Sequence, residues 1–495
     1  MLNTGKKFVL ILLLAIILRS TGIISRPIWY DEAFSILLAE QGPDAILAGT
    51  ISTNTDSSAA EEHPPAYYFL LWGWIQLFGR SLISARMLSI SISLGVIFLI
   101  YRITDHLFDQ HTALLAALLA AILPFQIHYG QEIRMYGLLT FWLCLTTFAF
   151  LKKKWWLFSI SAALAQYTHN LAAIYLIPLA LTPIFYRDWK ALRSLILSGL
   201  VSIIIYLPWA IHLPAQLSKV SKTYWVEQPG VEKIFTLILY YLPNMPLPNN
   251  MLMAGLLLAT LTVTLAVFQT ILARKKEPST ASNGIWLAYL AFTPPLLLWL
   301  ISQFVPIYVE RALLPSHAIF CIWLAWVLTR TKAPQPIRVF MTILILASSF
   351  LGISQHIAYK GFPYGPFAKI GQTISSEINP GDMVLHSSKL SYLPSLYFNH
   401  DLPQGYIIDP SGSTVDTLAP STRDILGLTG YEDISSATID TSRIWFIIYQ
   451  TSIDEYASQG ETNHPQLTYL ESEFNLESVK KQDDIVVYLF SKNKP

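Results

Sequence analysis

The sequence opens with an apolar run that leads directly into acidic and aromatic residues: KKFVLILLLAIILRSTGIISRPIWYDEAF, residues 6–34. Residues 8–24 are long enough to cross the hydrocarbon core of a bilayer, which takes about 17–25 apolar residues. No small-residue cleavage site follows the run, so we expect a retained helix and not a cleaved signal peptide. This stretch predicts a membrane protein that carries polar chemistry at the bilayer surface.

The composition of the whole chain agrees with this interpretation. Of its 495 residues, 53% are hydrophobic and only 13% are charged, whereas a soluble domain carries about 25% charged residues. Together with 8–24, further apolar runs make eleven expected crossings: 82–101, 112–126, 135–151, 155–169, 170–186, 194–212, 251–273, 285–304, 312–328 and 339–355. Residues 66–78 form a shorter aromatic run, which is more typical of an interfacial or re-entrant helix.

The distribution of charge predicts the orientation of these crossings. If 66–78 does not cross, the basic clusters fall in alternate gaps, which the positive-inside rule places in the cytoplasm. These clusters are Lys6-Lys7, Arg102, Lys152-Lys153-Lys154, Arg187/Lys190/Arg193, Arg274-Lys275-Lys276 and Arg330/Lys332/Arg338. The remaining gaps, which hold most of the acids and histidines, then share the outer face with the C-terminal tail.

The tail differs physically from the rest of the chain. Residues 356–495 contain 9 Lys and Arg against 17 Asp and Glu, a net charge of −8, while the remainder carries 24 against 15, or +9. Its pattern predicts a helix over 367–378 and strands over 383–386, 443–449 and 484–490. We therefore expect a polytopic α-helical protein with a catalytic membrane domain, 1–355, outer-face juxtamembrane helices, and a small extracytoplasmic α/β domain, 356–495.

Two clusters in the first outer loop, 25–81, carry candidate chemistry. Asp31 and Glu32 follow the first span, and Asp31 is expected to cap a short helix through Ala39. A carboxylate beside aromatics at the bilayer surface is a candidate proton acceptor, and helix capping is the structural alternative. Glu62 and His63 precede a Pro-Pro step that favours helix entry, and they are candidates for a divalent cation or phosphate site as well as for simple capping.

Later outer gaps repeat the combination of acid and guanidinium. Glu132 and Arg134 lie between two apolar runs, where charge is costly unless it is paired or functional. Arg134 suits bidentate phosphate binding, and an ion pair with Glu132 or Glu310 is the structural alternative. Arg311 heads the next span in the same way, while a lone His169 at a helix junction is the weaker candidate.

Four of these motifs, taken in order, resemble the GT-C membrane glycosyltransferases of the protein O-mannosyltransferase and aminoarabinose-transferase type, glycosyltransferase family 39 and its bacterial relatives. The likeness covers about residues 6–330, and its motifs are Trp29-Tyr30-Asp31-Glu32-Ala33, His63-Pro64-Pro65-Ala66-Tyr67-Tyr68, Tyr129-Gly130-Gln131-Glu132-Ile133-Arg134-Met135-Tyr136 and Glu310-Arg311-Ala312-Leu313-Leu314-Pro315. Each motif is short, but their order and their membrane positions make the combination fairly specific.

This resemblance implies that the chain is an inverting enzyme acting on a lipid-linked sugar. Asp31 would be the general base toward the acceptor hydroxyl, and Glu32 would orient Asp31 or the acceptor. The resemblance further implies that donor-phosphate binding falls to Arg134 and Arg311, with His63, Glu132 and Tyr136 in the same subsite. His63 stands where the aminoarabinose transferases have a lysine, which leaves metal ligation by Glu62 and His63 as an alternative.

The expected partners follow from the side of the membrane. Nucleotide sugars are not available outside the cytoplasm, and the sequence has no Gly-rich phosphate loop, so we expect a polyprenyl-phosphate sugar donor and no nucleotide cofactor. The acceptor is a glycolipid, a glycan or a protein, and no nucleic acid is expected. A divalent metal ion remains an open possibility. The expected location is the bacterial cytoplasmic (inner) membrane, and the competing functions are a lipid-linked sugar flippase or an oligosaccharide ligase or polymerase.

Overall fold

Helices occupy all eleven of the expected apolar runs. The computed structural model describes residues 3–51, 63–214, 226–276, 278–411, 413, 415–439, 441–460 and 463–492. The helices on the apolar runs are α1 (Thr4–Ser20), α5 (Leu82–Leu107), α6 (Gln110–Ile122), α8 (Tyr136–Leu151), α9 (Trp155–Thr168), α10 (Ala172–Phe185), α11 (Trp189–Ala210), α14 (Asn249–Lys276), α15 (Pro278–Ser302), α16 (Leu314–Arg330) and α17 (Gln335–Ala358). By length and composition, six spans among the described residues can cross a membrane. The predicted polytopic helical architecture is confirmed.

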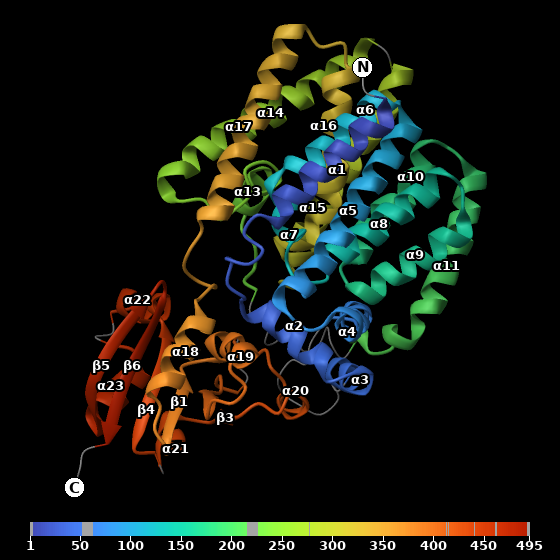
Figure 1. Cartoon of the computed structure of the whole chain (residues 1–495). Helices are drawn as coiled ribbons and strands as arrows, with labels where there is room; N and C mark the ends of the chain where they lie inside the picture. The colour runs from blue at the N-terminus through green and yellow to red at the C-terminus, as the bar shows by residue number, and fades with distance from the viewer. Residues whose placement is uncertain are drawn as a thin grey trace.

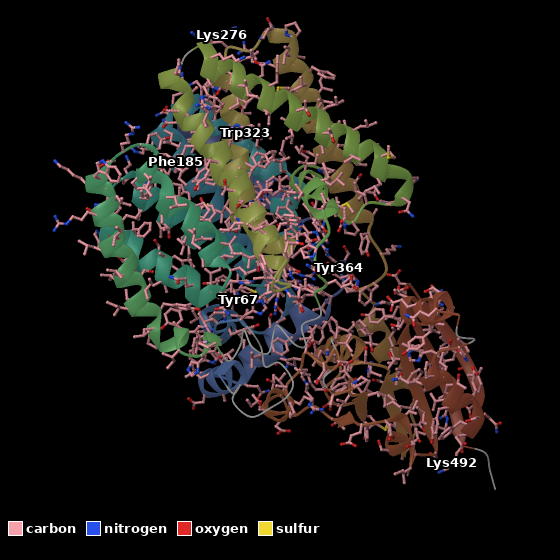
Figure 2. The ribbon with its side chains drawn as sticks, turned by 180° about the vertical axis from the view of Figure 1, so that it is seen from behind. Tyr67, Phe185, Lys276, Trp323, Tyr364 and Lys492 are labelled. Atoms are coloured by element: carbon pink, nitrogen blue, oxygen red, sulfur yellow. The ribbon has the colours of Figure 1, made fainter. Side chains whose placement is uncertain are left out.

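Shorter helices gather at one end of these spans. They are α2 (Tyr30–Glu40), α3 (Pro43–Ile51), α4 (Ala66–Phe78), α7 (Pro124–Tyr129), α13 (Glu232–Tyr241) and the 3-10 helix η1 (Glu310–Leu313). Figure 1 shows α2, α3 and α4 between the spans and the C-terminal domain, with the N-terminus at the far end. We call the end that holds α2 and α4 the site end. The opposite end, where Figure 2 labels Lys276, is the basic end.

The sequence predicted one continuous helix over the apolar run 112–126. In the structure this run is broken between α6 and α7. Pro124 lacks the N–H group that would otherwise bond the carbonyl of Ala120. The buried guanidinium of Arg19 on α1 replaces it, donating to the carbonyl oxygens of Ala120 at 3.0 Å and Ala121 at 3.1 Å and to Ser93 Oγ at 2.8 Å. Arg19 thereby fixes the direction in which the chain enters the Glu132–Arg134 loop.

A glycine completes this join. At Gly130 a Cβ atom would lie 2.6 Å from the carbonyl oxygen of Gln126 and 2.7 Å from Ser93 Oγ, so a larger residue requires the backbone to shift. Gln131 follows and donates from Nε2 to the carbonyl oxygens of Arg19 and Thr21, at 2.6 and 2.9 Å. The loop that carries Glu132 and Arg134 is therefore tied to the end of the first span.

The C-terminal residues form a mixed α/β domain around one six-stranded sheet. Its elements are α18 (Phe367–Glu377), β1 (Asp382–His386), α19 (Lys389–Phe398), β2 (Gln404–Ile407), α20 (Pro420–Ile425), β3 (Gly430–Tyr431), α21 (Ile434–Thr438), β4 (Arg443–Tyr449), α22 (Gln450–Ser458), α23 (Pro465–Glu473), β5 (Phe474–Gln482) and β6 (Ile485–Lys492). The strand order is β3-β2-β1-β4-β6-β5, in which β3, β2, β1 and β4 are mutually parallel, β6 is antiparallel to β4, and β5 is antiparallel to β6. The expected small C-terminal α/β domain is confirmed.

The central strand β4 explains why this sheet is covered on both faces. Alternate residues of a strand point to opposite faces, and both sets in β4 are apolar. Phe446 lies in one buried cluster with Ile444, while Trp445 lies in the other with Ile447. The domain then contacts the site end through α19, which packs on α2, and through the Tyr397 hydroxyl, which donates to the carbonyl oxygen of Arg80 at 3.0 Å.

Candidate functional site

The Asp31 carboxylate lies between two guanidinium groups from distant parts of the chain. Arg311 Nη1 is 2.8 Å from Asp31 Oδ2, and Arg134 Nε is 3.7 Å from the same oxygen. Asp31 occupies the first turn of α2, while Trp29 is the N-cap residue, so the expected capping role of Asp31 is wrong. The side chain of Asp31 retains 13% exposure, which leaves its carboxylate accessible to a small reactant.

Arg311 connects Asp31 to an adjacent cavity. Its guanidinium carbon lies 5.6 Å from the ring centre of Trp29 and 5.2 Å from that of Tyr136, so the cation is flanked by two aromatic side chains. Burial by itself lowers the pKa of Arg311, but Tyr136, Asp31 and Glu132 outweigh it and raise that pKa above its ordinary value. The group therefore keeps a permanent positive charge at the cavity wall.

Arg134 is more deeply buried than the sequence suggested. It is only 5% exposed, and its Nη1 lies 3.3 Å from both Ser35 Oγ on α2 and the hydroxyl of Tyr68 on α4. Among the described residues, Arg134 pairs with Asp31 and not with Glu132 or Glu310, and Glu310 pairs with Lys233 at 2.5 Å. Arg134 accordingly holds α2, α4 and the Asp31 carboxylate in one arrangement.

Glu32 faces away from Asp31 into a buried ion pair. Arg86 Nη2 lies 2.8 Å from Glu32 Oε2, and both side chains are 3% exposed or less. Glu32 Oε1 also accepts from the backbone N–H of Ile133 at 3.2 Å, while Arg86 donates to the carbonyl oxygens of Ile23, Arg26 and Pro27. This pair joins α2 to α5 and to the loop that carries Arg134, a positioning role that the sequence did not indicate.

Glu132 borders a cavity beside Arg311. The cavity has a volume of about 280 Å³ and is lined by Arg26, Trp29, His128, Tyr129, Glu132, Tyr240, Pro243, Asn244, Met245, Pro246, Arg311, Gly352, Gln355, His356, Tyr359, Pro363 and Tyr364. Burial raises the pKa of Glu132 from 4.5 to about 7, with Arg311 acting in the opposite direction. Among the described residues, no hydrogen-bond donor meets its buried Oε2 atom. Glu132 therefore offers the cavity a carboxyl group that titrates near neutrality.

A second cation lines this cavity, and sequence reasoning missed it. Arg26 Nη1 lies 3.0 Å from the ring nitrogens of His356 on α17, and Nη2 lies 3.3 Å from Nε2 of His128 on α7 and donates to the hydroxyl of Tyr364. Burial, followed by the charge of Arg26, lowers the pKa of His128 well below its ordinary value. The partners of Arg26 are thus neutral. Among the described residues no carboxylate forms an ion pair with it, so its charge is available to the cavity.

His63 and His169 lie next to each other, and His169 lies beside Tyr136. Their ring centres are 4.8 Å apart, and the His169 ring is 5.6 Å from that of Tyr136. Glu62, the other expected metal ligand, lies outside the described residues. Within the part of the chain that the structure describes, no group of three acidic, histidine or cysteine side chains forms a metal site. The described part of the chain therefore contributes two adjacent imidazole rings here, from His63 and His169.

Comparison with known proteins identifies the fold. The chain has the GT-C fold seen in membrane glycosyltransferases of the protein O-mannosyltransferase and aminoarabinose-transferase type, as the motifs predicted. A sequence model described as dolichyl-phosphate-mannose-protein mannosyltransferase matches residues 62–212. No curated protein sequence matches the chain.

Solved structures give the more detailed likeness. ArnT from Cupriavidus metallidurans, crystallised with undecaprenyl phosphate, is similar over 99% of this chain and 98% of its own, at 13% identity and a TM-score of 0.63. The AglB oligosaccharyltransferase of Archaeoglobus fulgidus, in complex with an inhibitory peptide and a dolichol-phosphate, is similar over 98% of this chain and 74% of its own, at 12% identity and a TM-score of 0.54. A complex of the A. fulgidus oligosaccharyltransferase with Zn and sulfate is similar over 98% and 73%, at 13% identity and a TM-score of 0.52.

Proposed function

We propose that the protein is an inverting glycosyltransferase that moves a sugar from a polyprenyl-phosphate donor to an acceptor hydroxyl. The observation that carries this proposal is the accessible Asp31 carboxylate, fixed by Arg311 and Arg134 beside a cavity with two cationic walls. The acceptor is a glycolipid, a glycan or a protein of the cell envelope, and the reaction takes place on the outer face of the bacterial cytoplasmic membrane.

The reaction is a single displacement. Asp31 accepts the proton of the acceptor hydroxyl as its oxygen forms a bond to the anomeric carbon, and the bond from that carbon to the phosphate oxygen breaks on the opposite face. The electron pair of the broken bond stays on the polyprenyl phosphate. Arg311 lines the cavity and is suited to stabilising this developing charge in a partly dry site. Because Arg134 is buried against Asp31, Ser35 and Tyr68, we assign it to positioning the base.

The donor class is supported by two independent considerations. An enzyme on the outer face has no access to nucleotide sugars, so its activated sugar must arrive on a lipid. The two similar structures with bound carriers, ArnT with undecaprenyl phosphate and AglB with a dolichol-phosphate, contain phosphates of this kind. Near neutral pH, a protonated Glu132 donates a hydrogen bond to such a phosphate, and an ionised Glu132 repels it.

A divalent metal ion fits one side of this site only in part. Glu62 and His63 would hold the ion. His169 would be a third ligand, since its ring centre lies 4.8 Å from that of His63. A bound cation would supply additional positive charge for the leaving phosphate. The alternative is direct phosphate binding by His63. Zinc titration of His63→Ala against wild type, followed by calorimetry, distinguishes the two, because only metal ligation predicts zinc binding that the substitution abolishes.

Transfer from a radiolabelled polyprenyl-phosphate sugar to membrane acceptors tests the proposal. Wild type is expected to transfer label, and Asp31→Asn to lose at least a hundredfold in rate. Asp44→Asn is the matched control, because Asp44 is an exposed acid of the same outer segment, on α3. Equal rates for the two variants would remove Asp31 from its role. Binding of lipid donors without any transfer would favour a flippase.

A further inference from the structure

A larger cavity lies at the basic end, far from Asp31. It has a volume of about 440 Å³ and opens between α6, α16 and α17. Helix α16 packs closely on α6, whereas α17 packs mainly on α14, and the cavity occupies the space between α17 and the other two helices. The proposed sugar transfer uses none of these residues, so the cavity needs an explanation of its own.

The lining of this cavity changes along its length from polar to apolar. At the basic end, Asp109 Oδ2 lies 2.6 Å from Arg330 Nη2, and the hydroxyls of Thr112 and Thr329 are 3.1 Å apart. Further along the helices, the wall consists of aliphatic side chains, namely Leu115, Leu119 and Ile122 from α6 and Ile345 and Leu346 from α17. A ligand that fills the groove must be amphipathic, with a polar head at the mouth.

The length of the groove matches one leaflet. Asp109 and Ile122 are thirteen residues apart along α6, and a helical rise of about 1.5 Å per residue makes this roughly 20 Å. Half of a bilayer's hydrocarbon core is about 15 Å deep, and the headgroup layer adds several ångströms. The polar mouth therefore lies at headgroup level when the aliphatic wall lies among the acyl chains.

The charge of the mouth selects the kind of head. Arg330 is balanced by Asp109, but Arg338, in the first turn of α17, is exposed and has no acidic partner among the described residues. The mouth carries one net positive charge before His111 is counted. The helix dipole at the start of α17 adds to this charge. An anionic head neutralises the net positive charge of the mouth. A zwitterionic head does not, because it carries a cation of its own.

We propose that this groove binds an anionic phospholipid of the adjacent leaflet. Its phosphodiester contacts Arg338 and the Arg330 side of the Asp109–Arg330 pair, and one acyl chain lies along Leu119, Ile122 and Ile345. Lipid bound there holds α17 against α6 and α16. Because α17 also carries His356 into the cavity near Asp31, occupancy at the basic end stabilises the helix on which the other cavity depends.

The test compares lipids that differ only in the head. Purified protein in detergent is titrated with phosphatidylglycerol and with phosphatidylcholine of the same acyl chains, and bound lipid is counted by native mass spectrometry while the unfolding temperature is recorded. Wild type is expected to retain phosphatidylglycerol and to unfold at a higher temperature with it. Arg338→Gln is expected to weaken its binding about tenfold. Thr342→Trp, which fills the groove sterically, is expected to abolish binding.

Arg193→Gln is the matched control, because Arg193 is an exposed cation on α11 outside the groove. This variant is expected to bind phosphatidylglycerol as wild type does. Equal retention of both lipids by wild type would overturn the proposal, and so would equal phosphatidylglycerol binding by Arg338→Gln and Arg193→Gln. Tighter Arg338-dependent binding of undecaprenyl phosphate than of phosphatidylglycerol would also overturn it, by making the groove a carrier site.

Discussion

Neutralising Glu32 tests whether this acid takes part in the reaction or anchors the site. In Glu32→Gln the Arg86 guanidinium stays buried and loses its carboxylate partner. Among the described residues, its remaining acceptors are neutral, namely the glutamine oxygen and the carbonyl oxygens of Ile23, Arg26 and Pro27. Breaking one side of a buried ion pair costs about 3–5 kcal/mol, because the other charge is left uncompensated. We therefore expect Glu32→Gln to lower the unfolding free energy by about 3–5 kcal/mol, and Arg86→Met to do the same.

A double mutant separates the pair from its surroundings. In Glu32→Gln/Arg86→Met no buried charge remains, so its loss should fall short of the sum of the single losses by about 2 kcal/mol or more. Urea unfolding in detergent micelles, followed by tryptophan fluorescence, measures all three. Glu40→Gln is the control, since Glu40 lies on the same helix as Glu32. Its pair with Arg80, at 3.4 Å, is partly exposed, and breaking it should cost less than about 1 kcal/mol.

The opposite result is equally clear. If Glu32→Gln is as stable as Glu40→Gln and still loses transfer, Glu32 acts on the reactants, and the positioning role inferred from its contact with Arg86 is refuted. If the losses of the two single variants simply add, the 2.8 Å contact carries no coupling energy. The first of these results would reinstate Glu32 as an orienting group for the acceptor.

Three further predictions concern the cavity. In wild type, kcat/KM for transfer should decline as pH rises through about 7, because Glu132 ionises there and repels the donor phosphate. A pH profile of Glu132→Gln should show no such decline. Arg26→Gln should raise the KM for the lipid donor about tenfold and leave the unfolding midpoint within a few degrees, since Arg26 has neutral partners; unchanged donor kinetics would contradict this. Gly352→Ala should destabilise the fold and reduce transfer, because its Cβ would lie 1.9 Å from the carbonyl oxygen of Pro243 and 2.5 Å from Pro124 Cγ, and normal stability in a thermal melt would contradict it.

The sequence predicted the helices and strands far better than the contacts between them. Long apolar runs identify spans because backbone groups in a bilayer must bond internally, and the short run 66–78 became α4 with the same bounds. Strand 443–449 was predicted from its apolar residues, which occupy both faces of the strand. The break at Pro124 was missed because Arg19, whose side chain meets the freed carbonyls, lies about a hundred residues earlier.

The site was predicted as a set of positions but not as a set of partners. Short motifs identified Asp31, Arg134 and Arg311, and the structure brings these three together. Pairing depends on side-chain direction, however, and nothing in one sequence indicates that Glu32 reaches Arg86. The cluster around Arg26 was missed for a related reason. Its members come from three remote segments, and none carries a motif of its own.

The packing of α19 on α2 gives the water-exposed domain a mechanical part in the chemistry. Helix α2 carries Asp31 and has α4 on one flank and α19 on another. Removing residues 359–495 would take away that second support, along with the Tyr364 contact to Arg26. A truncated chain that still inserts in the bilayer would thus hold α2, and with it the base Asp31, less firmly. Damage on the far side of the soluble domain can therefore slow turnover.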